Sequence, residues 1–243
     1  MFPYGYGLTY ADRRELALLS EQRFTVINPN QQHNAGQIPL FLRNLAPGLA
    51  FTLTDQGGLA VTVTTPFGVS NDGKSLTMQS VNLSYQEDGR QLRWDAGQPV
   101  QASLRFTKTA ARKDFTSANT LRFSMRLDQQ QSEKLQHPAR LELAVLCDAA
   151  GACQRQLNLD ETLATFNPGI WQQIEVDLDC LPTPARDAQL QDAVVFSGSG
   201  RFSLAVADIT LINTALADSS RPADSKPLRL GCGAGLPRNK TTH

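Results

Sequence analysis

Alternation of apolar and polar residues with a period of two constrains the fold of this chain most strongly. Six short runs carry apolar side chains at every second position: Leu59–Val63, Val100–Phe106, Leu121–Leu127, Leu141–Cys147, Ile174–Leu178 and Phe202–Val206. Such runs are typical of strands that bury one face. No long stretch shows the period of a helix, and no βαβ alternation suggests a parallel sheet. The sequence therefore predicts an all-β fold, an antiparallel β-sandwich of the jelly-roll type.

Turn-forming clusters separate the runs and set the expected domain boundaries. These clusters are 71–73 (Asn-Asp-Gly), 87–89 (Glu-Asp-Gly), 148–151 (Asp-Ala-Ala-Gly), 167–169 (Asn-Pro-Gly) and 198–200 (Gly-Ser-Gly). We expect the sandwich to span 49–216. The Pro- and Asn-containing stretch 23–48 is predicted to be a linker or an irregular entry into the sandwich, and the Ser-, Pro- and Gly-rich stretch 217–243 an irregular tail tied by Cys232.

Composition removes several classes of partner. The 243 residues have a formal net charge of zero, with 41% hydrophobic and 19% charged residues, so a globular fold is expected. A neutral chain has no electrostatic reason to bind nucleic acid or an anionic membrane. No apolar run approaches the length of a membrane span. We expect neither partner.

The residues of common active sites are not assembled in the sequence. Hydrolysis of a glycosidic bond usually requires two carboxylates that flank the bond, and the Asp and Glu residues here are scattered through turns and outer strand faces. The histidines, His33, His137 and His243, lie far apart and are expected at the surface. No Cys and His cluster has metal-ligand spacing. The chain is predicted to be no enzyme and to need no cofactor.

The first residues resemble a known signature. The string 2–10 (Phe-Pro-Tyr-Gly-Tyr-Gly-Leu-Thr-Tyr) resembles the end of the second catalytic-region domain of glycoside hydrolase family three, which contains β-glucosidases and exo-β-glucanases. The rest resembles the extra C-terminal module of bacterial exo-1,3/1,4-β-glucanases. That likeness rests on the Cys147/Cys153 pair, on the segment Gly169–Cys180 and on the strand Phe202–Leu211.

The resemblance implies a galactose-binding-like sandwich and a parent enzyme of the periplasm or the extracellular medium. Residues 1–22 would then be the tail of a preceding hydrolase domain. The catalytic carboxylates of the related hydrolases lie upstream of this string, outside the chain.

Two tryptophans are candidates for contact with sugar, because the apolar face of a sugar ring stacks on an aromatic ring. Trp94 is in phase with Leu92, so core packing is favoured, and sugar contact is the alternative. Trp171 leads a strand and corresponds to a packing residue in the resembling modules, so we also assign it to the core.

Asp208 interrupts an apolar line. It continues the phase of Phe202, Leu204 and Val206, after which apolar residues shift to Ile209 and Leu211. A β-bulge that turns Asp208 outward is the favoured interpretation. Binding of a structural calcium ion is the alternative.

The four cysteines predict two disulfides, Cys147–Cys153 and Cys180–Cys232. Cys147 and Cys153 bracket a turn-forming stretch, so a hairpin would bring them close, and the other two then remain for each other. Disulfides imply an oxidising compartment. The competing interpretation is four reduced thiols in a cytosolic protein.

Two functions remain open at this point. The first is a non-catalytic module that docks on the catalytic domains of its parent hydrolase and stabilises them. The second is a carbohydrate-binding module for β-glucan. The first is favoured because neither tryptophan is expected at the surface and no exposed aromatic row is evident.

Overall fold

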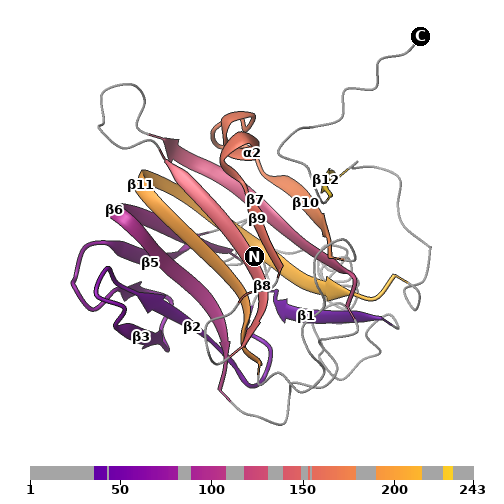
Figure 1. Cartoon of the computed structure of the whole chain (residues 1–243), viewed down its shortest axis with the longest axis horizontal. Helices are drawn as coiled ribbons and strands as arrows, with labels where there is room; N and C mark the ends of the chain where they lie inside the picture. Colours follow the sequence, from indigo (N-terminus) through magenta and orange to yellow (C-terminus); the bar gives the residue numbers. More distant parts are fainter. Residues whose placement is uncertain are drawn as a thin grey trace, which may run out of the picture. The chain divides into compact units, whose positions relative to one another are not determined.

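The computed structural model describes residues 36–42, 44–81, 89–107, 118–130, 139–148, 153, 155–178, 190–214 and 227–231. Its strands are β1 (Gln37–Phe41), β2 (Leu49–Thr54), β3 (Ala60–Val63), β4 (Gly68–Val69), β5 (Leu76–Val81), β6 (Gly89–Phe106), β7 (Thr120–Gln130), β8 (Arg140–Asp148), β9 (Arg155–Asn158), β10 (Gln172–Asp177), β11 (Leu190–Ile212) and β12 (Leu228–Leu230). One short helix, α2 (Asp160–Ala164), follows β9 (Figure 1). The prediction of an all-β fold is confirmed.

Two long strands connect the layers of the sandwich. β6 pairs with β11 in antiparallel fashion along almost its whole length, opposite residues 192–206 of β11. The first half of β11 and the second half of β6 form one sheet with the strand order β9-β8-β11-β6-β2-β3. We call this sheet the disulfide layer. The second half of β11 and the first half of β6 form another sheet with the strand order β12-β10-β7-β11-β6-β5-β4. We call this sheet the Trp171 layer. Each long strand therefore contributes to both faces of the core.

A bend in β11 permits this passage. The register between β11 and β6 shifts between Gly198 and Gly200, and Gly200 has a φ of 93°. A β-carbon at Gly198 would lie only 2.6 Å from Nε1 of Trp94. The prediction that a turn at 198–200 separates two strands was wrong. The glycines instead bend a continuous strand, because hydrogen bonds to β6 hold the backbone on both sides of them.

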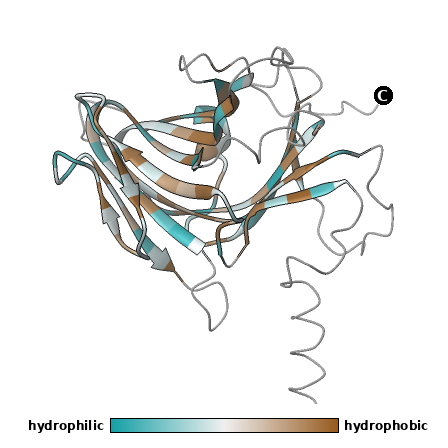
Figure 2. Cartoon of the chain, turned by 90° about the horizontal axis from the view of Figure 1, so that it is seen from below, coloured by the Kyte–Doolittle hydropathy of each residue, from teal (hydrophilic) through white to brown (hydrophobic). Residues whose placement is uncertain are grey.

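The space between the layers is filled by the alternating apolar residues. Trp94 is fully buried, and its ring stacks on Phe202 with centroids 4.8 Å apart. Phe123 and Phe196 meet edge to face at 5.8 Å and join β7 to β11. Coloured by hydropathy, the strands carry brown apolar bands that alternate with pale or teal positions (Figure 2). The period-two pattern of the sequence is thus the pattern of core-facing side chains.

The predicted domain boundaries need correction at both ends. The stretch 23–48 was interpreted as a linker or an irregular entry segment outside the sandwich, yet from Gly36 it belongs to the same compact unit as the sandwich. β1 pairs with the end of β11, beyond the point where β6 begins, and Leu40 and Phe41 are fully buried. Two buried side chains and a ladder of backbone hydrogen bonds make this segment part of the domain.

The tail is likewise not wholly irregular. β12 lies within 217–243 and pairs with β10 in parallel, an exception to the antiparallel pattern. Glu175 of β10 accepts a hydrogen bond from Arg122 of β7 at 2.9 Å and forms an ion pair with Arg229 of β12 at 3.3 Å. This buried carboxylate joins three strands, which places Leu230 against the core.

Candidate binding face

Trp171 lies on the outer face of the Trp171 layer, contrary to its assignment to the core. It stands three positions before Ile174, whose side chain is buried, so it has the opposite phase and shares the orientation of Gln173 and Glu175. The ring is half-buried. A β-carbon built at Gly89, an outward-facing position of β6, would touch its Cη2 at 3.4 Å. The parity of position 171 relative to Ile174 and Val176 would have placed this side chain correctly.

A row of polar side chains leads across the strands to Trp171. Gln79 of β5 donates from Nε2 to Oε1 of Gln91 on β6 at 2.5 Å, and Gln91 donates from Nε2 to Oδ2 of Asp128 on β7 at 2.5 Å. Asp128 pairs in turn with Arg126, whose guanidinium lies 4.9 Å from the Trp171 ring centroid. We call the four residues Gln79, Gln91, Asp128 and Arg126 the polar row.

Small residues on the central strand make the row possible. β11 runs between β6 and β7, so Gln91 and Asp128 belong to strands about 10 Å apart. Ala205 lies between Gln91 and Arg126 in the register and is completely covered. A methyl side chain at this position leaves space for Gln91 and Asp128 to meet above β11. Neither sequence spacing nor composition reveals this contact, because its partners are 37 residues apart in the chain.

Trp94 lies in the core, as the favoured interpretation predicted. Its Nε1 donates to the carbonyl oxygen of Val100 at 3.1 Å, so its polar atom is satisfied inside the protein. The side chain has no exposed surface. The alternative assignment of Trp94 as a sugar contact is therefore wrong for this structure.

Asp208 stands at a bulge and is exposed. The register of β11 with β7 shifts between Ala207 and Thr210, and Asp208 has a φ of 53°. This left-handed conformation restores Ile209 to the core and turns Asp208 outward, where it accepts from the Ser124 hydroxyl at 3.3 Å. Among the described residues no group of three or more His, Cys, Asp and Glu side chains could hold a metal ion. The bulge is as predicted.

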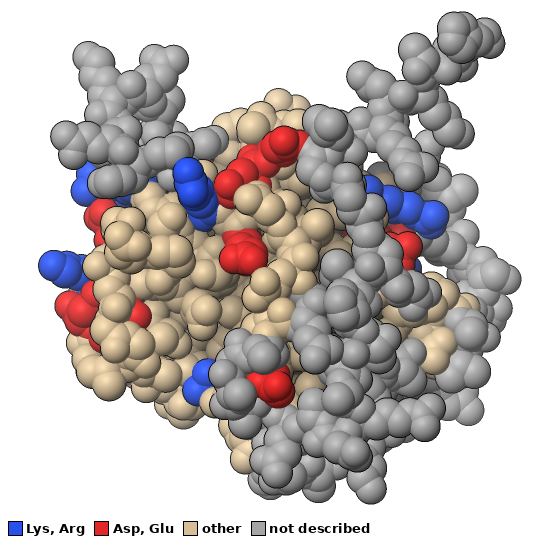
Figure 3. Space-filling view, viewed as in Figure 1, with Lys and Arg blue, Asp and Glu red and all other residues tan. Residues whose placement is uncertain are grey.

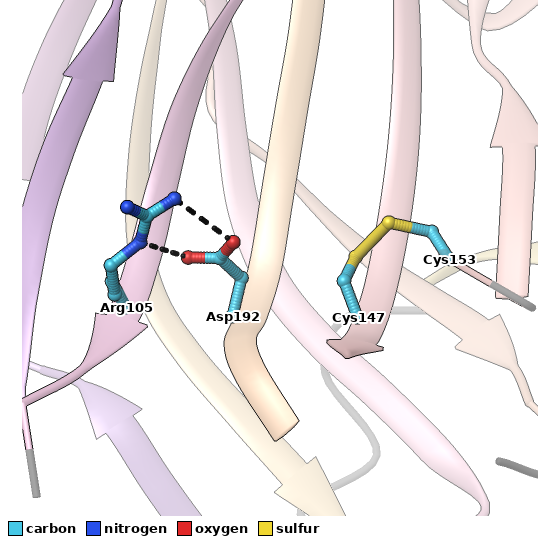
Figure 4. Close-up of a disulfide and its surroundings, with 4 residues drawn as sticks. All are labelled: Arg105, Cys147, Cys153 and Asp192. Atoms are coloured by element: carbon cyan, nitrogen blue, oxygen red, sulfur yellow. Dashed lines mark hydrogen bonds and ion pairs between the residues drawn. A yellow bond between two sulfur atoms is a disulfide. The ribbon is translucent and has the colours of Figure 1, made fainter. Parts of the chain in front are cut away.

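The disulfide Cys147–Cys153 lies on the outer side of the disulfide layer (Figure 4). The sequence places Cys147 in phase with Val145, but Leu146 has a φ of 55° and both Val145 and Leu146 reach the core. Cys147 consequently turns to the other face and packs with Ala144 and Val195. There its Cα lies 4.3 Å from that of Cys153.

An ion pair lies beside the disulfide on the same layer. Asp192 of β11 is directly opposite Cys147 of β8. Arg105 of β6 donates to its two carboxylate oxygens, from Nε at 2.8 Å and from Nη2 at 3.3 Å (Figure 4). A bidentate pair has a defined geometry, so it ties β6 to β11, while the disulfide ties the end of β8 to the segment before β9.

Several predictions fall outside the described residues. These are the histidines (His33, His137, His243), the second cysteine pair (Cys180, Cys232) and the segment 1–22. The Cys180–Cys232 disulfide and the origin of the first residues stay predictions.

Charge does not mark out a site on the described part of the face shown in Figure 3. A few acidic and basic side chains of both signs are scattered there among uncharged ones. Within the described ranges, no helix is long and apolar enough to cross a membrane.

Comparison with known proteins defines the class to which this sandwich belongs. The Exop_C family model, described as galactose-binding domain-like, matches residues 51–211. The chain belongs to this family. No curated protein matches it.

Two solved structures from a Pseudoalteromonas species are similar along most of the chain. The extra C-terminal domain X of the exo-1,3/1,4-β-glucanase ExoP is 28% identical, with a TM-score of 0.61, over 80% of this chain and 98% of that domain. Full-length ExoP is 27% identical, with a TM-score of 0.62, over 83% of this chain. The chain spans only 22% of the ExoP length, so it corresponds to the extra domain. The predicted resemblance is confirmed.

A more remote likeness is that to the family 11 carbohydrate-binding module of the cellulase Lic26A-Cel5E of Clostridium thermocellum. The identity is 8% and the TM-score 0.43, over 74% of this chain and 96% of that module. Similarity at this level carries no argument about function.

Proposed function

We propose that this chain is the non-catalytic C-terminal module of a β-glucan-hydrolysing enzyme, where it docks on the catalytic domains and stabilises them. The observation that carries the proposal is the match in sequence and fold over almost the whole extra domain of ExoP. The module adds a core of its own, so it folds as a unit and offers its outer faces to neighbouring domains.

The proposal is tested by joining the module to its parent. Sequencing upstream of Met1 should reveal an open frame that encodes two catalytic domains. The catalytic region should melt at a lower temperature without the module than with it, and the purified 243-residue chain should not hydrolyse aryl β-glucosides. A promoter and start site directly before Met1, or turnover abolished by changing one of the chain's acidic residues, would contradict the proposal.

We place the parent enzyme in the periplasm or outside the cell. The Cys147–Cys153 disulfide supports this location, since such bonds persist in oxidising compartments and are rare in the cytosol. Mapping of the thiols in protein from a periplasmic extract tests it. Four free thiols there would remove the support.

The second candidate function is binding of β-glucan by the module itself. The position of Trp171 favours it, because a half-buried indole on an outer face is available to a ligand, whereas a core tryptophan is not. Calorimetric titration with laminarin and cellooligosaccharides separates the two candidates, since a purely structural module shows no heat of binding.

A further inference from the structure

We propose that the outer face of the Trp171 layer is a binding site for a neutral, extended β-glucan chain, formed by Trp171 and the polar row. The proposal rests on the second candidate function and gives it a location. No catalytic group is involved, because the site holds the polymer and leaves its bonds intact.

The chemistry of the row fits an uncharged polyol. Gln79 and Gln91 present amide groups that both donate and accept, which matches hydroxyl groups with the same dual capacity. The two charges of the row, on Arg126 and Asp128, neutralise each other through their ion pair. A row with paired charges and amide groups favours a neutral ligand over an anionic or cationic one.

The tryptophan beside the polar row supplies an apolar contact. Trp171 is half-buried, the Arg126 guanidinium lies 4.9 Å from its ring centroid, and its Cη2 lies near Gly89. An indole beside hydrogen-bonding groups suits a sugar ring, which has an apolar C–H face and hydroxyl groups at its rim.

The dimensions of the site indicate an oligomer. The backbone positions of the site run across β5, β6, β11 and β7 to the start of β10, which makes four strand spacings or about 19 Å, and the Trp171 ring lies back over these strands with its Cη2 near Gly89 of β6. The side chains are already hydrogen-bonded to one another in the free protein, so binding immobilises few rotamers. A chain of several sugar units lying across the strands would contact the entire site, whereas a monosaccharide would contact one part.

The test compares two glutamines of the same strand. Gln91 and Gln101 both belong to β6 and both point outward, but Gln91 lies on the Trp171 layer and Gln101 on the disulfide layer. Calorimetry and affinity electrophoresis with laminarin and cellohexaose are run on the 243-residue chain and on Gln91→Ala, Trp171→Ala, Trp171→Phe and Gln101→Ala. Thermal melting of each variant reports folding.

We expect Gln91→Ala and Trp171→Ala to weaken glucan binding at least about tenfold, Trp171→Phe to weaken it less, and Gln101→Ala to leave it unchanged. If Trp171→Ala fails to fold, Gln91→Ala and Trp171→Phe decide the result. If the wild type binds glucan and none of the Trp171-layer variants binds it more weakly, the proposed site is wrong, but the carbohydrate-binding function is retained. Absence of binding to either glucan would overturn both, and the docking function would be unaffected.

Discussion

Replacement of Gly198 by Ala tests how the sandwich bends. The new β-carbon would lie 2.6, 2.7 and 2.9 Å from Nε1, Cε2 and Cδ1 of Trp94. Favourable contacts between such atoms begin near about 3.5 Å, so the indole would have to retreat by about 0.6–0.9 Å. Phe202 stacks against the ring and Val100 accepts its N–H, and both restrict this movement.

The expected cost follows from these contacts. Overpacking of a core by one methyl group costs about 1–3 kcal/mol. The backbone of Gly198 is outside the left-handed region, so alanine can adopt it without strain. Alanine also lowers the conformational entropy of the unfolded chain, which stabilises the folded state by about 0.4–1 kcal/mol. The net loss is about 1–2 kcal/mol, which lowers the melting temperature by about 2–8 °C for a domain of this size.

Urea unfolding followed by tryptophan fluorescence measures this loss. Gly97→Ala is the matched control, because Gly97 lies at the same bend, on β6, with no atom within 4 Å of its added β-carbon. That variant should be as stable as the wild type or slightly more. Combining Gly198→Ala with Trp94→Phe should cost less than the sum of the two changes, since the smaller ring leaves space. A Gly198→Ala protein with wild-type stability would refute the reasoning.

Three further changes probe other parts of the domain. Trp94→Ala should lower the free energy of unfolding by about 3–5 kcal/mol and Trp171→Ala by clearly less, since only the first ring is fully buried; equal losses in urea would show Trp171 to be a core residue. Replacing Cys147 and Cys153 by Ala opens a loop with a sequence separation of 6 and should cost about 2 kcal/mol, and a variant as stable as the oxidised protein would contradict this. Hydrogen bonds, chiefly from the Ser75 hydroxyl, hold the pKa of Asp72 well below its usual 3.8, so its stabilisation is present above about pH 4 and lost as the pH falls below that. Asp72→Asn should therefore show a smaller drop in melting temperature between about pH 7 and pH 3 than the wild type, and an unchanged drop would exclude this role.

Sequence periodicity predicted the strands well and misjudged the places where a strand departs from regular geometry. At Leu146 and Asp208 a positive φ changes which face the following side chain occupies. Asp208 could be recognised because a charge interrupts an apolar line. Leu146 could not, because both of its neighbours are apolar and either phase is plausible for them.

One part of the candidate site could be predicted from the sequence and another part could not. The outward orientation of Trp171 is contained in the sequence, as its parity relative to Ile174 shows. The sequence does not reveal that Gln91, Asp128 and Arg126 lie near one another, because residues on β6 and β7 become neighbours only when β11 places the two strands on either side of it.

The sequence by itself determined the all-β class, the core-facing positions and the likeness to the extra domain of ExoP, because alternation and short motifs are properties of the local chain. Only the tertiary structure decided that β6 and β11 serve both layers, that β1 and β12 complete the Trp171 layer, and that the polar row and Trp171 meet on one outer face. The physical reason is that period-two patterning specifies which side of a strand is buried. It does not specify which strand lies beside it, and that choice depends on hydrogen bonds and packing between residues far apart in the chain.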